Sequence, residues 1–290
     1  MRRYRSVILL SVLLASPDSW PRDFHFSNWS DNPRPFLDAI QRSALQSLPA
    51  LPAGQRICGG IVTHHFLASG LMVRFFDGLR SQTSPETIVL LGPNHFHQGL
   101  ANISISSLPW KTPFGVLPAD THLVKKIGAA IRLPEDPEAF SGEHSVGVLI
   151  PFLKYYFPRS KVVPILIDVN AQESHLEELR DVLSQVLKNS KTLVLLSMDF
   201  SHDSIAAIAD ARDRTAEQVI SAMDARKTHD LNVDCRKGLR VLLESLRRAG
   251  YDGVRFNEHT NSARLTGKPE QPDVTSYFTI YFLNSPPRPF

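Results

Sequence analysis

Histidine and carboxylate residues recur at the ends of apolar runs in this sequence. His64, His95 and Asp199 each follow such a run, and Glu143 and His144 lie in a polar stretch that precedes another one. Imidazole nitrogens and carboxylate oxygens bind iron, copper and zinc. Two imidazoles with one carboxylate leave positions open for a reactant, which is typical of a catalytic metal site. The sequence therefore predicts one polar site that can hold a metal ion.

Further histidines accompany these positions. Seven of the 11 histidines lie in or beside these segments, at positions 64, 65, 95, 97, 144, 202 and, more loosely, 122. Taken singly, a histidine after a strand is more often a loop residue with a local partner, and Asp199 could simply cap the next helix. Cys235 is by default a small buried apolar residue. The joint pattern favours a shared site, in which Glu143, Asp199 and Asp203 are candidates to orient the imidazoles.

Apolar runs alternate with amphipathic segments along the chain, which predicts an α/β fold. Strands are expected at 57–62, 87–91, 102–106, 161–167, 192–197, 254–258 and 276–283. Helices are expected at 69–80, 120–131, 146–157, 173–187, 205–223 and 236–249, with Pro151 as a kink or a helix start. Continuous apolar strands between helices favour a single domain with a mainly parallel central sheet flanked by helices. Such sheets bind ligands outside the carboxyl ends of their strands, where the candidate site residues lie.

Composition narrows the class of protein. Of the 290 residues, 42% are hydrophobic and 21% are charged, which excludes a wholly disordered chain. The formal net charge of +3 is too small to indicate nucleic-acid binding, so no nucleic-acid partner is expected. Two cysteines cannot form a disulfide framework.

The N-terminal region differs from the rest. Three arginines precede a short apolar run, so residues 1–20 are expected to be a signal or anchor segment, with a buried strand or a mis-chosen start as alternatives. Export or membrane anchoring depends on residues 1–16, and otherwise the protein is expected in the cytoplasm. Residues 21–56 are expected to wrap around the domain, with a helical piece at 36–48, and residues 57–290 form the α/β domain.

Five motifs then occur in a fixed order. They are Gly60-Ile-Val-Thr-His64-His65, Leu91-Gly-Pro-Asn-His95, Glu143-His144-Ser145, Leu195-Leu-Ser-Met-Asp199-Phe-Ser-His202 and Asp234-Cys235. This series resembles the Memo family, which includes the AmmeMemoRadiSam system protein B of prokaryotes, and the match runs from about residue 57 to residue 283. The family is similar in fold to the class III extradiol dioxygenases, which use non-haem iron(II).

The resemblance implies roles for individual residues. It implies metal ligands at His64, His95 and Cys235. It also implies that the Glu143–His144 and Asp199–His202 pairs belong to the catalytic machinery, with His144 or His202 as the general acid or base and Glu143 or Asp199 fixing its tautomer. Two departures leave alternatives open. The His-His sequence allows His64 or His65 to bind the metal, and an ungapped alignment places Asp234 at the family's cysteine position.

The expected function is accordingly a mononuclear metal pocket. Fe(II) is the expected ion, with copper or zinc as alternatives, in an oxidase or dioxygenase-like enzyme whose substrate is an unidentified small molecule or peptide. A hydrolase would use the same ligands with a metal-activated water. A third alternative is a non-catalytic ligand-binding or scaffold protein. A simple anion pocket would more naturally use arginine than histidine, and the arginines near these motifs are Arg74 and Arg236.

Overall fold

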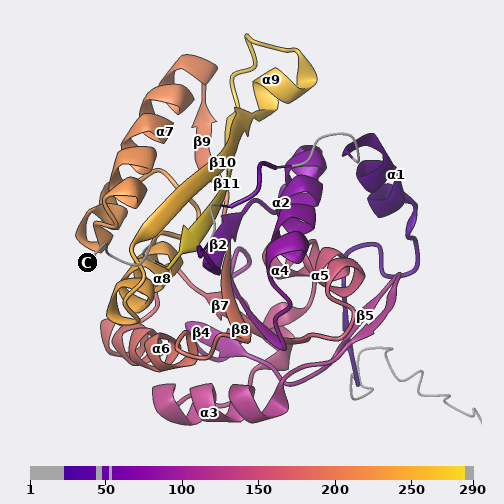
Figure 1. The fold of residues 1–290 in the computed structure, drawn as a ribbon, viewed down its shortest axis with the longest axis vertical. Coiled ribbons are helices and arrows are strands. Elements are labelled where there is room, and N and C mark those ends of the chain that lie inside the picture. The colour runs from indigo at the N-terminus through magenta and orange to yellow at the C-terminus, as the bar shows by residue number, and fades with distance from the viewer. Residues whose placement is uncertain (1–22, 44–47, 52–53, 285–290) are drawn as a thin grey trace, which may run out of the picture.

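An eight-stranded sheet lies at the centre of the fold (Figure 1). The computed structural model describes residues 23–43, 48–51 and 54–284, and the strand count refers to these residues. The sheet contains β2 (Ile57–Val62), β3 (Thr87–Pro93), β4 (Ile103–Ile105), β7 (Lys161–Ile167), β8 (Thr192–Ser197), β9 (Phe200–Ser204), β10 (Gly253–Asn261) and β11 (Val274–Leu283).

The strand order is β10-β11-β2-β8-β3-β7-β4, with β9 paired to β11. The four strands β2, β8, β3 and β7 are mutually parallel, and antiparallel strands flank them on both sides. Val62 pairs with Ser197 and Pro93 with Ile167, so the carboxyl ends of the parallel strands are level with one another. This register brings the loops after these strands to one edge of the sheet.

Helices cover both faces of the sheet (Figure 1). One face is packed against α1 (Arg34–Ser43), α2 (Ser69–Gln82), α4 (His144–Gly147) and α5 (Ile150–Tyr156). The other is packed against α3 (Thr121–Ile131), α6 (Glu173–Val186), α7 (Ala206–Ser221) and α8 (Arg236–Arg248). Along β3, Leu90 belongs to the first of these two cores and Leu91 to the second. Burial on both faces explains why the parallel strands are continuous apolar runs, and it confirms the predicted α/β architecture.

Several elements differ from the sequence-based expectation. The helix expected at 146–157 is two helices, α4 and α5, and Pro151 lies in the first turn of α5, where its missing N–H costs no hydrogen bond. A small second sheet and the strand β9 were not foreseen. The second sheet consists of β1 (His25–Phe26), β5 (Trp110–Thr112) and β6 (Gly115–Leu117). These strands are too short to show an apolar pattern, and β9 is largely polar.

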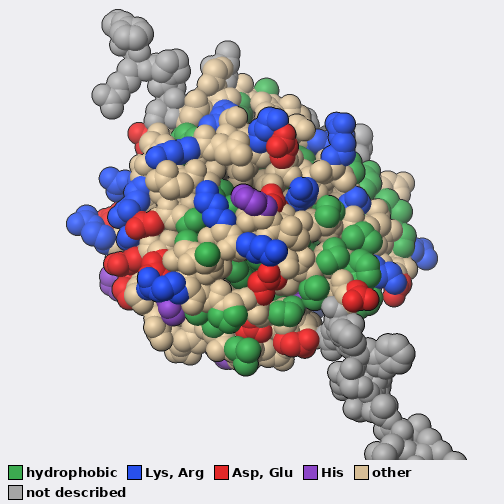
Figure 2. All heavy atoms as spheres, turned by 90° about the horizontal axis from the view of Figure 1, so that it is seen from below, with side chains coloured by type: hydrophobic (Ala, Val, Ile, Leu, Met, Phe, Trp, Pro, Cys, Tyr) green, Lys and Arg blue, Asp and Glu red, His purple; other side chains and the backbone are tan. Residues whose placement is uncertain are grey.

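The remaining elements are the short helices η2 (Phe66–Ala68), η3 (Pro137–Phe140), η4 (Ala225–Asp230) and α9 (Ser262–Thr266). The expected signal or anchor at residues 1–20 lies outside the described residues, and none of the described helices could cross a membrane. On the face that Figure 2 shows, basic and acidic side chains are interspersed.

The two-sided packing of the parallel strands can be tested with a matched pair of leucines. Leu195 on β8 is fully buried, whereas Leu100 is 89% exposed. We expect Leu195→Ala to lower the free energy of unfolding by about 2–5 kcal/mol, because it leaves a cavity in a packed core. Leu100→Ala should change it by less than about 0.5 kcal/mol. Urea denaturation followed by circular dichroism measures both, and equal effects would contradict the described packing.

Candidate metal centre

His64 lies directly beyond the carboxyl end of β2, and its side chain is buried. Its Nδ1 lies 2.9 Å from Oγ of Ser197, at the end of the neighbouring strand β8. Its backbone N–H donates to Oδ1 of Asp199 at 3.2 Å. The ring is therefore oriented through Nδ1, and Nε2 points to Oδ2 of Asp234, 3.3 Å away.

His95 follows β3 and is held by one carboxylate. Its backbone N–H donates to Oε2 of Glu143 at 2.8 Å, and its Nδ1 lies 2.9 Å from Oε1 of the same residue. Glu143 also accepts the backbone N–H of Ser145 at 2.8 Å. With Nδ1 engaged in this way, Nε2 of His95 remains available and lies 3.7 Å from Oδ2 of Asp234.

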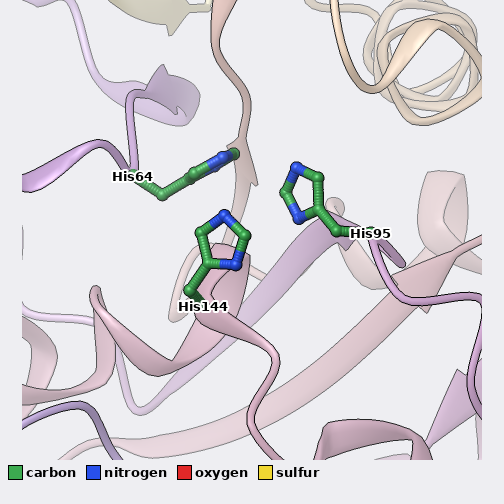
Figure 3. A group of neighbouring side chains, drawn as sticks. All are labelled: His64, His95 and His144. Atoms are coloured by element: carbon green, nitrogen blue, oxygen red, sulfur yellow. The ribbon is translucent and has the colours of Figure 1, made fainter.

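His144, the first residue of α4, is the third imidazole of this group. Its ring is stacked on that of His95 at a centroid distance of 4.3 Å and lies edge-on to His64 at 5.4 Å. Figure 3 shows the three rings converging from separate elements, and one nitrogen of each lies within 4.8 Å of the others. This approach requires Gly92 on β3, where a Cβ would lie 2.8 Å from Oγ of Ser145.

Two aspartates complete the cluster. Asp199 accepts hydrogen bonds from the hydroxyl of Thr63 and the backbone N–H of His64, and its Oδ2 lies 3.8 Å from Nε2 of His64. Asp234 accepts the backbone N–H of Asp199 at 3.1 Å through Oδ2. Its Oδ1 is buried and has no hydrogen-bond partner among the described residues. A buried carboxylate oxygen without a partner is costly, and a bound cation would remove that cost.

Burial and neighbouring charges determine the pKa values of the acids and imidazoles in the cluster. Burial disfavours the charged form of His95, but the hydrogen bonds and charges of Asp234 and Glu143 outweigh burial and raise its pKa to about 9. Burial would raise the pKa of Glu143, but hydrogen bonds from His95 and Ser145 together with the His95 charge lower it to about 2. Burial and the neighbouring His95 and His64 lower the pKa of His144, so its imidazole is neutral at pH 7.

Not all residues predicted for the site converge on it. Cys235 is buried in the core against Gly238, and burial raises the pKa of its thiol. Nδ1 of His65 lies 2.6 Å from the hydroxyl of Tyr277. Other predicted positions lie apart as well. His97 pairs with Asp168, and His122 lies near the beginning of β3.

The cluster opens into a pocket of about 470 Å³. His64, His65, His95, His144, Asp199 and His202 line it, together with Asn28, Trp29, Phe66, Val148 and Thr275. Ser197 and Thr63, which contact His64 and Asp199, are polar residues at the ends of apolar runs. This pattern in the sequence could have identified them as site residues. Asn28 and Trp29 come from the N-terminal segment, where no local pattern indicates a role. The pocket has the size of a small-molecule site.

The donor set fits a metal ion. His64 and His95 each have one ring nitrogen oriented by a hydrogen-bond partner and the other directed at Asp234. This is the arrangement by which proteins fix the tautomer of metal-binding imidazoles. The Oδ1 of Asp234 adds a carboxylate oxygen that no donor among the described residues satisfies.

Comparisons with known proteins confirm the family resemblance. The family model of the Memo-like protein matches residues 29–281. A MEMO1 family protein of Aquifex aeolicus is 36% identical over 209 residues, which cover 69% of this chain and 76% of that protein. A MEMO1 family protein of Pyrobaculum aerophilum is 29% identical over 240 residues, covering 79% of this chain and 84% of the relative.

A solved structure of an uncharacterized protein from Escherichia coli K12 shares the fold. It superposes with a TM-score of 0.52 at 12% sequence identity, and the match covers 77% of this chain and 98% of that one. At this identity the similarity concerns the fold alone. The family model, by contrast, matches most of the chain, and the matched range contains the positions of all five motifs. The chain belongs to the Memo-like protein family.

Proposed function

We propose that this Memo-like protein is a metal-dependent oxidoreductase with a mononuclear non-haem iron(II) site. The observation that supports it is the convergence of His64, His95 and Asp234. Oδ2 of Asp234 lies 3.3 Å from Nε2 of His64 and 3.7 Å from Nε2 of His95. Two histidines and one carboxylate with open positions are typical of non-haem iron(II) oxygenases. When bound, the iron would supply dioxygen activation, for which protein side chains have no equivalent.

The residues around this set can bind and move a proton. His144 is neutral at pH 7, is partly exposed to the pocket and lies beside the two imidazoles proposed as ligands. An imidazole in this state can accept a proton from a substrate hydroxyl and return it later. Glu143, 3.6 Å from Nδ1 of His144, would stabilise the protonated form. Asp199 holds the backbone of His64 in place, and His202 lines the same pocket.

A second function is favoured by one observation. Nitrogens of His64, His95 and His144 lie within 4.8 Å of one another, and three histidines are also a catalytic zinc set. In that case Asp234 would stay outside the first coordination shell, and a metal-activated water would hydrolyse the substrate. The two ligand sets differ in whether Asp234 or His144 is required for metal binding.

Metal reconstitution tests the proposal and separates the two ligand sets. Under anaerobic conditions we expect the wild type to bind about one iron(II) per chain, and His64→Ala, His95→Ala and Asp234→Asn to lose at least about 90% of it, because each removes a ligand. His65→Ala is the matched control and should keep the metal, since His65 contacts Tyr277.

Elemental analysis after gel filtration gives the stoichiometry. Full iron content in both His64→Ala and His95→Ala would rule out the site. Retention of metal in Asp234→Asn together with its loss in His144→Gln would replace the iron proposal by the zinc set. A folded wild type that binds neither iron, copper nor zinc would instead favour a non-catalytic binding protein.

The pKa of His95 predicts how metal affinity depends on pH. Because this imidazole is protonated below about pH 9 in the metal-free protein, a metal must displace a proton from it. The apparent association constant should therefore rise about tenfold per pH unit up to about pH 9 and then level off. Glu143→Gln removes one of the carboxylates that raise this pKa, so the plateau should begin at lower pH. Titrations in competing chelator buffers measure both curves, and a flat wild-type curve between pH 7 and pH 9 would contradict the assignment of His95.

A further inference from the structure

Asp234 also lines a second cavity, which contains none of the three clustered histidines. It has a volume of about 200 Å³ and is lined by residues 167–169, His229 and residues 234–237. These segments are the carboxyl end of β7, part of η4 and the start of α8. Asp234 therefore borders this cavity, while its Oδ2 lies 3.3 Å from Nε2 of His64. The cavity and the proposed metal site therefore have the side chain of Asp234 in common.

Two cations at this cavity have no acidic partner. Nζ of Lys237 donates to the carbonyl of Ala171 at 2.7 Å, and Nη1 of Arg236 donates to the carbonyl of His229 at 3.3 Å. Neither side chain forms an ion pair with any described residue. No described acid therefore neutralises these two positive charges, so both are free to bind an external anion.

Two other arginines of the same helix are paired with acids. Arg240 pairs with Glu173, and Arg248 with Asp181 at 2.5 Å. Arg247 has no acidic partner among the described residues, but it donates to the carbonyl of Met223 and does not line the cavity. Arg236 and Lys237 are therefore distinguished by their position in the cavity lining. Because Lys237 is half-buried, its charge is less screened by solvent than that of an exposed lysine.

The acids at the cavity are engaged elsewhere. Oδ2 of Asp168 lies 2.6 Å from Nδ1 of His97, and Oδ1 of Asp168 accepts the backbone N–H of Asn170 at 2.7 Å. Asp234 directs Oδ2 towards His64 and the backbone N–H of Asp199. Neither carboxylate contacts Arg236 or Lys237 within ion-pair distance, so the cations keep their capacity to bind an anion.

The rest of the lining is apolar. Ile167 and Cys235 are buried, and Val169 is 56% exposed at the mouth. The volume of about 200 Å³ corresponds to six or seven water molecules at roughly 30 Å³ each, and it accommodates a chain of several carbon atoms. A ligand that matches this lining has a short apolar body and one anionic end.

We propose that this cavity is a subsite for the carboxylate end of an organic acid, which Lys237 and Arg236 bind, and that the other end of the acid extends past Asp234 into the histidine pocket. The second half of this statement rests on the proposed metal function, whereas the binding of the carboxylate does not. A monocarboxylate suits the site better than a phosphate dianion, because its apolar part occupies the cavity. His229 is already paired with Asp230 at 3.1 Å and contributes little further charge.

The test is a calorimetric titration of the full, chelator-treated protein with hexanoate at low ionic strength. We expect saturable binding that Lys237→Gln weakens at least about tenfold, since a charge-assisted hydrogen bond is lost. Arg236→Gln should weaken it by a smaller factor, because Arg236 is exposed. Arg240→Gln is the matched control on the same helix and should leave the affinity unchanged. Thermal unfolding of each variant verifies that it is folded.

Competing explanations give different results. Equal affinity for hexanol, or for hexanoate in the wild type and Lys237→Gln, would overturn the subsite. Inorganic phosphate binding as tightly as hexanoate would overturn the organic-acid class. The titration uses metal-free protein. If hexanoate does not bind, this result therefore counts against the subsite and leaves the proposed iron site untouched. Conversely, a His64→Ala variant that binds hexanoate but no iron supports the subsite and the ligand role of His64 separately.

Discussion

The parallel register of β2, β8, β3 and β7 is the constraint on which the site depends. Because these strands end level with one another, the residue types that follow them meet at one edge whatever their separation in sequence. His64 and Asp199 follow adjacent strands, and His95 follows the next one. The strands themselves are held by burial on both faces, so the position of the imidazoles is determined by the core. Loops alone could not position three side chains from distant parts of the chain to within a few ångströms.

The cluster of charges is stabilised unevenly. Glu143 accepts two backbone N–H groups and faces one imidazole, and Asp199 accepts a hydroxyl and a backbone N–H. These hydrogen bonds therefore largely offset the free-energy cost of burying the two carboxylates. Asp234 is the exception, since one of its oxygens has no partner among the described residues. In a network that is otherwise satisfied, such an oxygen supports the proposal that an external cation binds beside it.

The sequence reveals the parts of the site that follow from strand ends. His64 and His95 can be found because apolar β-type runs end just before them, and sheet topology makes such ends converge. The choice between Asp234 and Cys235 cannot be made in this way, because neighbouring residues at a helix start differ in direction by details of the backbone. In the structure, Asp234 faces the histidines and Cys235 packs in the core. Asn28 and Trp29 reach the pocket through the pairing of β1 with β5, a two-residue contact without a sequence pattern.

A carboxylate at position 234 has consequences that a cysteine side chain would not have. A thiolate offers one soft sulfur atom, whereas a carboxylate offers two hard oxygens, each of which can contact a different group. Oδ2 of Asp234 faces His64 and the backbone of Asp199, and the same side chain borders the cavity at the start of α8. Its negative charge also accounts for part of the raised pKa of His95, which a neutral thiol would not produce. The identity of this one residue therefore influences the proposed donor set, the protonation of its neighbours and the lining of the cavity at the start of α8.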